Sequence, residues 1–441
     1  MAGRRDLLAP AASYPERYPA LLASAVSGTP QSRFDLLFAA GDESLTLHAD
    51  GVVRDGRGDV VAGGFLDALD AAWATRRRQR VDDGLPFHGG WVVYLAYELV
   101  GQIEPSLRLP SSTGAAPLAV ALRTPAAAIV DHVEERTILV AEEGAAHWLD
   151  RLAADLDEPM PPLALSAPLA VDEDEPRRFL DGVSRIHEHL RAGDVFQVNL
   201  SRRWCARFAE APVPASLMLA LRQANPAPFA GLLQQPGWAI VSSSPERLVE
   251  SRDGLLQTRP IAGTRPRVAG DDDAERIREL TTHPKERAEH VMLIDLERND
   301  LGRVCVPGSV RVDELMAVES YAHVHHIVSN VSGRAREGVT PGQVIAATFP
   351  GGTITGCPKV RCMEIIGALE QEPRGAYTGA LGYLDDQGDM DLNILIRTLT
   401  VEGTDVSFRA GAGIVTDSVA ERELDETRAK ARGLLRVFGA A

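Results

Sequence analysis

The sequence predicts an α+β protein in which largely antiparallel sheets pack against helices. Alternating apolar and polar residues at 44–53 (SLTLHADGVV) and 89–99 (GGWVVYLAYEL) are typical of antiparallel strands. Long amphipathic helical patterns follow in the second half, as at 177–193 (RRFLDGVSRIHEHLRAG), which ends in a glycine. Strands and helices alternate there without the regular βαβ rhythm of a parallel sheet.

The remaining elements follow in chain order from the same patterns. Strands are expected at 195–208, 238–244, 376–385, 391–401 and 406–415, with a turn after the second of them. Helices are expected at 284–302, 358–372 and 418–438. A proline-rich and acidic stretch without sustained period interrupts the chain at 155–178. We therefore expect an N-terminal region at 1–156, a linker at 157–176 and a catalytic region at 177–441.

Composition limits the classes of partner. The chain has 441 residues, of which 45% are hydrophobic and 24% charged, so it is a globular chain and not a disordered one. Lys and Arg total 46 against 62 Asp and Glu, a net charge of −16, which disfavours nucleic acid and anionic lipid. No apolar run is long enough to span a membrane or serve as a signal peptide, so we expect a cytoplasmic protein. The four cysteines show no zinc-binding spacing, and we expect reduced thiols.

Lysine is rare in this chain. Only Lys285, Lys359 and Lys430 occur among the 46 basic residues. A position that keeps lysine in such an arginine-rich chain can require a compact ammonium in place of a planar guanidinium, although chance is the alternative.

Two helical segments carry acidic residues on one face. In the last helix Glu423, Glu426 and Lys430 have i, i+3 and i+4 spacing, and Glu286, Glu289, His290 and Leu293 have such spacing in the helix at 284–302. Solvated ion pairs are the simpler explanation of either face. Two acidic faces together suggest a hard cation bound by oxygen ligands, for which Mg²⁺ is best suited.

Several loops could contact an anion or hold a catalytic acid. Gly411 and Gly413 come at a predicted strand end, where glycine lets backbone N–H groups approach a ligand, or serves a tight turn. The segment 258–267 (TRPIAGTRPR) has the composition of a rigid surface turn. Glu246 follows a strand and a proline, and His325 and His326 point to opposite faces of a predicted strand. The run GGTITGCPK lacks the spacing of a phosphate loop, so nucleotide binding is not expected.

Six ordered motifs together resemble the chorismate-utilising enzymes, the family that holds anthranilate synthase, aminodeoxychorismate synthase, isochorismate synthase and salicylate synthase. The motifs are PIAGTRPR, KERAEHVMLIDLERNDLGRV, FPGGTITGCPKVRCMEII, GDMDLNILIRT, AGAGIVTDS and ELDETRAKA. The resemblance implies a two-lobed fold like that of anthranilate synthase, with the active site in the central cleft. It also implies chorismate as substrate and Mg²⁺ as cofactor.

The resemblance assigns roles to particular residues. Glu289 and Glu426 match the metal ligands, with Glu286 and Glu423 acting through water, and Glu246 matches the general acid that protonates the departing 4-hydroxyl. The positions that hold or line the substrate are matched by Thr353, Tyr377, Arg397, Gly411, Gly413 and Lys430. Thr264, His326 and Gln197 fall on further active-site positions, and Ala262 stands where some members carry a lysine nucleophile.

Gln197 and Ala262 separate the members of the family. Water-using members carry a lysine base where this chain has Gln197, and a neutral amide cannot deprotonate water. Amination with ammonia from a separate glutamine amidotransferase subunit is therefore expected. FQVNL, VHHIVS and FPGGTITG resemble aminodeoxychorismate synthase component I, which we favour. Ala262 is the residue typical of anthranilate synthase, which stays the alternative.

Two further questions concern regulation and activity. The segment LLAS at 21–24 resembles the LLES motif of tryptophan-regulated members but has Ala23 in place of the acid, so inhibition by tryptophan is not expected. A non-catalytic chorismate-binding homologue is a hypothesis of another class. The presence of Glu246, Glu289 and Glu426 argues against it.

Overall fold

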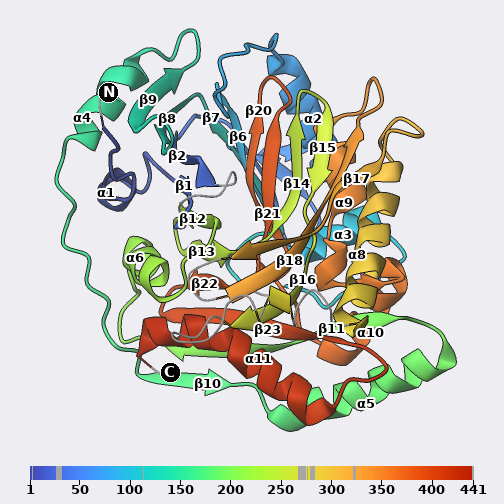
Figure 1. Cartoon of the computed structure of the whole chain (residues 1–441). Coiled ribbons are helices and arrows are strands. Elements are labelled where there is room, and N and C mark those ends of the chain that lie inside the picture. The colour runs from blue at the N-terminus through green and yellow to red at the C-terminus, as the bar shows by residue number, and fades with distance from the viewer. Residues whose placement is uncertain are drawn as a thin grey trace.

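Two large antiparallel sheets form the body of the molecule in the computed structural model (Figure 1). The structure describes residues 1, 3–25, 32–112, 114–266, 275, 277–278, 284–320 and 324–439. All strand pairs in the two sheets are antiparallel, as the sequence predicts.

The first sheet has eleven strands among the described residues. In pairing order they are β10 (Ala170–Glu173), β11 (Gln197–Arg207), β23 (Asp405–Ile414), β22 (Thr398–Glu402), β13 (Trp238–Ser244), β12 (Phe229–Gln235), β1 (Ala20–Ala23), β2 (Phe34–Ala39), β8 (Ala126–Asp131) and β9 (Arg136–Ala141), with β19 (Gly356–Cys357) beside β11.

The second sheet has twelve strands in the same part of the chain. In pairing order they are β16 (Ile261–Pro266), β18 (Val324–Arg334), β15 (Leu255–Thr258), β14 (Arg247–Arg252), β21 (Met390–Ile394), β20 (Ala380–Asp385), β6 (Gly90–Leu95), β7 (Ala119–Thr124), β3 (Ser44–Leu47), β4 (Val53–Asp55) and β5 (Val60–Val61), with β17 (Arg311–Ser320) beside β18.

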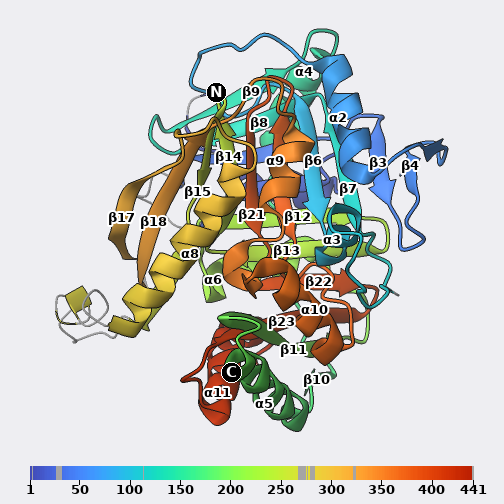
Figure 2. The ribbon, with the colours of Figure 1, turned by 90° about the vertical axis from the view of Figure 1, so that its right-hand side faces the viewer.

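Helices cover the outer sides of the sheets. Figure 2 shows α8 (Pro284–Gly302) and α9 (Pro341–Thr348) along one side of the second sheet, whereas α10 (Lys359–Glu370) packs on β11 of the first sheet. Near the first sheet lie α1 (Leu8–Ser13), α4 (His147–Leu156), α5 (Pro176–Ala192), α6 (Pro214–Ala224) and α11 (Ala420–Leu435), and α2 (Phe65–Arg76) packs on α9. Short helical segments are η2 (Tyr97–Leu99), α3 (Val100–Ile103), η3 (Gly352–Ile354) and η4 (Arg436–Phe438).

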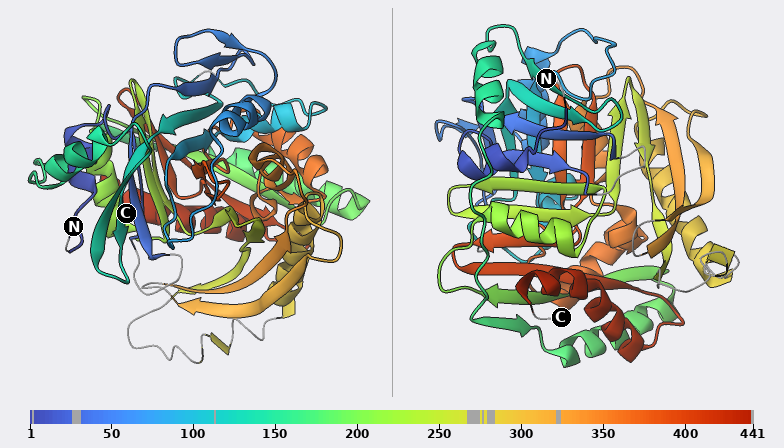
Figure 3. Two further views of the ribbon diagram at one scale, coloured as in Figure 1. Left: turned by 90° about the horizontal axis from the view of Figure 1, so that it is seen from above. Right: turned by 60° about the vertical axis from the view of Figure 1, so that its left-hand side comes forward.

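The two sheets share a core where they face each other. Phe38 of β2 and Phe87 touch edge to face, with ring centroids 5.1 Å apart, and both contact Tyr383 of β20. Aromatic pairs of this geometry stabilise beyond their area of contact. The N-terminal and C-terminal parts of the chain are therefore not separate bodies, because each sheet takes strands from both (Figure 3). The residue boundaries 1–156, 157–176 and 177–441 stay a prediction, and β10 lies inside the expected linker.

Helix α5 shows how local sequence sets these elements. Pro176 occupies the first turn, where its missing N–H costs no hydrogen bond, and Gly193 ends the helix with φ +77°. Phe179, Val183 and Ile186 are buried on one face. They pack on β11 and β23, and so hold the two strands that form one wall of the site.

Four expectations about local structure need correction. The strand expected at 391–401 is two strands, because β21 of the second sheet ends at Ile394 and β22 of the first sheet begins at Thr398. The segment at 258–267 is not a surface turn, because Ile261–Pro266 forms β16 and pairs with β18. The chain does not simply turn after β13, since it crosses at Pro245 and Glu246 into β14 of the other sheet. The pattern at 89–99 is a strand only to Leu95, after which the chain coils into η2 and α3.

Candidate active site

A cavity of about 470 Å³ lies between the ends of the two sheets. Strands β11 and β23 line it from the first sheet, β16 and β18 from the second, and α8 and α11 add side chains. Twelve of the residues singled out by sequence line it together: Gln197, Glu246, Glu289, His326, Thr353, Tyr377, Arg397, Gly411, Gly413, Glu423, Glu426 and Lys430. The side chains of Ala262, Thr264 and Glu286 lie outside the described residues, although Gly263 also lines the cavity.

Glu246 lies at the corner where the chain passes from β13 to β14. Its side chain is 6% exposed, and Thr353 donates a 2.7 Å hydrogen bond to its Oε1. Burial raises the pKa of Glu246 to about 7, although Thr353, the Ile261 amide, Lys430 and Arg397 all act to lower it. A carboxyl that is half protonated near neutral pH suits a general acid.

Arg397 brings a buried positive charge to the same cavity. Its backbone has φ +51°, a conformation that residues other than glycine adopt at a cost. Burial lowers the pKa of its guanidinium, while the negative charge of Glu246 acts to raise it. No described residue forms an ion pair with this guanidinium, so its five N–H donors remain available to an anionic ligand.

Lys430 of α11 also lines the cavity and is held by two contacts. Its Nζ donates to the Gly411 carbonyl over 2.9 Å and pairs with the Glu426 carboxylate over 2.8 Å. The sequence predicted that Glu423, Glu426 and Lys430 share one face of a helix. All three lie on α11 and line the cavity. Glu426, a predicted metal ligand, is thus paired with Lys430, a predicted substrate-binding residue.

The acidic residues form an all-oxygen donor set. Glu289 of α8 lines the same cavity as Glu423 and Glu426 of α11, although these helices are more than 100 residues apart in sequence. No three His, Cys, Asp or Glu side chains within the described part of the chain converge tightly enough to hold a metal ion. The carboxylate oxygens of these glutamates are nevertheless the kind of ligand that a hard cation prefers. His290, expected on the face of Glu289, turns away and bonds Ser329 at 2.7 Å.

Close packing surrounds the two glycines of β23, and it leaves least room at Gly411, where the neighbour is backbone. A Cβ on Gly411 would lie 2.7 Å from the Leu200 carbonyl and 2.7 Å from the Tyr377 hydroxyl, and one on Gly413 would lie 2.7 Å from Nε2 of Gln197. A side chain at either position would therefore displace a residue of the cavity wall. The predicted contact of their backbone N–H groups with an anion stays a prediction.

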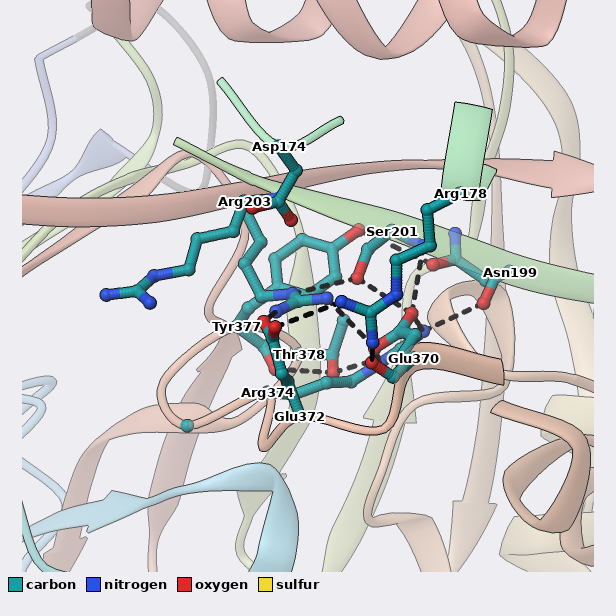
Figure 4. Close-up of polar contacts among 12 residues, drawn as sticks. Asp174, Arg178, Asn199, Ser201, Arg203, Glu370, Glu372, Arg374, Tyr377 and Thr378 are labelled. Carbon is teal, nitrogen blue, oxygen red and sulfur yellow. Dashed lines mark hydrogen bonds and ion pairs between the residues drawn. The ribbon is translucent and has the colours of Figure 1, made fainter. Parts of the chain in front are cut away.

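A buried ionic network beneath the cavity was not found from sequence. Glu370 of α10 receives hydrogen bonds from Ser201, Arg374 and Arg409. Figure 4 shows Ser201 and Arg374 near its carboxylate. Arg374 also donates to the carbonyls of Asn199 and Ile354. Burial alone would raise the pKa of Glu370, but the two guanidiniums lower it below its usual value. The network holds the backbone carbonyls of two lining residues, Asn199 and Ile354, and the side chain of a third, Arg409.

Comparison with known proteins identifies the family to which the chain belongs. The family described as chorismate binding enzyme matches residues 29–436. The chain belongs to this family, and it is a chorismate-utilising enzyme of the anthranilate synthase and aminodeoxychorismate synthase group. None of the helices in the described residues has the length and hydropathy needed to cross a membrane.

The relatives carry two different names. The chain is 39% identical to aminodeoxychorismate synthase component 1 of Bacillus subtilis over 88% of this chain and 86% of the relative. It is also 39% identical to anthranilate synthase component 1 of Thermus thermophilus, over 98% of this chain and 95% of the relative. The crystal structure of anthranilate synthase component I from Streptococcus pneumoniae superposes with a TM-score of 0.82 at 32% identity, covering 92% and 93% of the two chains. The predicted fold is thereby confirmed.

Proposed function

We propose that this chain is component I of an aminodeoxychorismate synthase. It would replace the 4-hydroxyl of chorismate by an amino group, giving 4-amino-4-deoxychorismate for folate synthesis. The sequence signatures FQVNL, VHHIVS and FPGGTITG support this choice within the family. The Bacillus subtilis relative of that name supports it as well.

One observation carries the proposal of amination: Gln197 is buried in the wall of the cavity that contains Glu246. Attack by water would need a base, and a carboxamide cannot serve as one. Lys430, the lysine in this wall, is already paired with Glu426 and bonded to Gly411. Unprotonated ammonia attacks without a base, and Glu246 can protonate the departing hydroxyl.

The positive groups of the cavity would hold the two carboxylates of chorismate. Arg397, whose guanidinium has no ion-pair partner among the described residues, offers a fork that matches a carboxylate with two parallel hydrogen bonds. Lys430, the Tyr377 hydroxyl and the amides near Gly411 and Gly413 would complete the anion site. Thr353 and His326 would line the ring and the enolpyruvyl side chain. This arrangement places a positive pocket inside an acidic protein.

A magnesium ion would be held by Glu289 and Glu426, with Glu286 and Glu423 acting through water. When bound, the ion would neutralise these carboxylates and attract a substrate carboxylate. Binding would also compete with Lys430 for Glu426 and free the lysine for the substrate. A separate glutamine amidotransferase subunit would supply ammonia, and we expect the complex to be cytoplasmic.

Anthranilate synthase component I is the second candidate. Ala262 favours it, because the lysine nucleophile of some aminodeoxychorismate synthases is missing at this position. The Thermus and Streptococcus relatives carry that name. Direct attack of ammonia at C2 would then lead towards anthranilate.

Product analysis decides between these reactions. The purified chain is incubated with chorismate, Mg²⁺ and ammonium, and the products are separated by chromatography with mass and fluorescence detection. We expect magnesium-dependent formation of 4-amino-4-deoxychorismate. Anthranilate as the sole product would establish the second candidate, and isochorismate would overturn amination. A chain that binds chorismate without consuming it would be a non-catalytic homologue.

A further inference from the structure

Asn199 of β11 is a polar residue in the wall of the cavity that the proposed chemistry does not use. It lies two positions after Gln197, on the same face of the strand, and is 6% exposed. Its backbone is held on both sides. The N–H donates to the Thr355 carbonyl over 2.9 Å, and the carbonyl accepts a 2.8 Å hydrogen bond from Arg374. The strand and the buried ionic network therefore fix the place of this side chain in the wall.

The side-chain oxygen of Asn199 has a partner. The Tyr377 hydroxyl donates to Oδ1 of Asn199 over 3.4 Å. Burial raises the pKa of Tyr377 to about 12, so the hydroxyl keeps its hydrogen at neutral pH. A phenol has a single hydrogen, and Oδ1 is the one acceptor for it among the described residues. This contact turns the oxygen of the amide towards Tyr377 and leaves the nitrogen on the other side.

The amide nitrogen of Asn199 has no such partner. No acceptor in the described part of the chain receives a hydrogen bond from Nδ2. The nitrogen is not sealed from the cavity that Asn199 lines. A largely buried amide therefore directs two N–H donors to the cavity. Such donors cost free energy unless water or a ligand accepts from them.

The amide lies over Gly411 of the neighbouring strand β23. A Cβ on Gly411 would lie 2.8 Å from Oδ1 of Asn199 and 2.7 Å from the Tyr377 hydroxyl, so glycine leaves the space in which these two side chains meet. The carbonyl of the same glycine accepts a 2.9 Å hydrogen bond from Nζ of Lys430. A neutral donor and a cation therefore come together at Gly411.

The neutral donor differs from the cation in its response to the acidic residues of the cavity. Lys430 is already paired with Glu426 over 2.8 Å. The carboxamide of Asn199 has no net charge, so these carboxylates do not attract it in the same way. A hydrogen bond from an amide to an ionised oxygen is stronger than one between two neutral groups. A carboxylate is therefore the ligand group that Nδ2 suits best.

We infer that Asn199 is a further substrate-binding residue, whose Nδ2 donates a hydrogen bond to one of the two carboxylates of chorismate. The inference rests on the proposed function for the identity of this ligand. Tyr377 is then a positioning residue, because its hydroxyl acts on the anion site by holding the amide of Asn199 in this orientation.

Asn199→Ala and Asn199→Asp test the inference. The dissociation constant of chorismate is measured by calorimetry with Mg²⁺ present, and thermal unfolding checks that each variant folds. Asn199→Ala should weaken binding roughly 10- to 100-fold, the usual effect of losing a hydrogen bond to a charged group. Asn199→Asp has nearly the shape of wild type but presents a charged oxygen in place of the nitrogen, so it should bind more weakly still.

Asn225→Ala is the matched control. It truncates an asparagine that bonds Ser243 and does not line the cavity, and it should bind chorismate like wild type. Unchanged binding in Asn199→Ala would overturn the inference. Binding by Asn199→Asp as tight as that of wild type would also overturn it, because the oxygen of the amide would then face the ligand.

Tyr377→Phe tests the positioning role. Alone it should weaken binding by less than Asn199→Ala does. Added to Asn199→Ala, it should change binding by less than about twofold, whereas additive losses would show that Tyr377 binds the ligand itself. A product other than 4-amino-4-deoxychorismate, together with weakened binding in Asn199→Ala, would overturn the proposed function and support this inference.

Discussion

Thr353 donates a 2.7 Å hydrogen bond to Oε1 of Glu246 and thereby orients the carboxyl at the corner between β13 and β14. Because Oε1 accepts this bond, the proton of the neutral acid belongs on the other oxygen. Thr353 precedes Ile354, whose carbonyl is held by Arg374. The buried network under the cavity therefore reaches the proposed general acid through the backbone of η3.

Thr353→Val should raise the pKa of Glu246. The hydroxyl bonds the carboxylate and so favours its charged form, and burial opposes it. A general acid works in its protonated form, so activity falls as pH rises through its pKa. The alkaline limb of the kcat–pH profile should therefore move upward in the variant. A downward movement would contradict the orientation assigned to this hydrogen bond.

Glu246→Gln should spare chorismate binding and reduce kcat roughly 10²–10⁴-fold, the usual effect of a lost general acid. The amide has nearly the same size and can still accept the hydrogen bond from Thr353. Chorismate affinity is measured by calorimetry with Mg²⁺ present, and turnover by the loss of chorismate absorbance. Full activity in the variant would remove Glu246 from the role of acid.

Glu426→Gln should weaken magnesium binding and nearly abolish turnover. The substitution removes a carboxylate from the set shared by α8 and α11, and it also breaks the pair with Lys430. Glu421→Gln is the matched control, since it makes the same charge change on an exposed residue of the same helix that does not line the cavity. Magnesium titrations of chorismate consumption compare the variants. Equal magnesium dependence in both would exclude Glu426 as a ligand.

The sequence predicted the antiparallel class of the fold and the gathering of the motif residues, because both depend on local pattern and motif order. Glu289 and Glu426 lie on different helices, yet both line the predicted cavity. Their roles as metal ligands stay predictions. The crossing of the chain from one sheet to the other at Glu246 could not be predicted, since two strands joined by two residues favour a hairpin.

The burial of charged residues was the other feature that could not be predicted from the sequence. Glu370 and Arg374 have the i, i+4 spacing that is typical of an exposed pair at the end of a helix. Only the packing of α10 against β11 removes both from water. Glu297 of α8 is also buried, and the sequence did not reveal this, because an acid in the run ERND resembles any polar helix residue. The sequence predicted anion binding at Gly411 and Gly413, which stays a prediction, and it did not reveal how closely the side chains of Tyr377 and Gln197 approach these glycines.

Glu370→Gln should destabilise the fold by about 3–5 kcal/mol, because Arg374 and Arg409 would lose their buried counter-charge. The pKa of Glu370 is lowered in the folded protein, so its contribution to stability is present above the unfolded pKa and lost as pH falls. The difference in unfolding free energy between wild type and variant should therefore shrink in acid. Urea unfolding at pH 7 and pH 4 measures both values. Glu372→Gln is the matched control on an exposed acid that also approaches Arg409, and it should cost no more than about 1 kcal/mol. Equal stability of the two variants would show that the buried network does not hold the floor of the cavity.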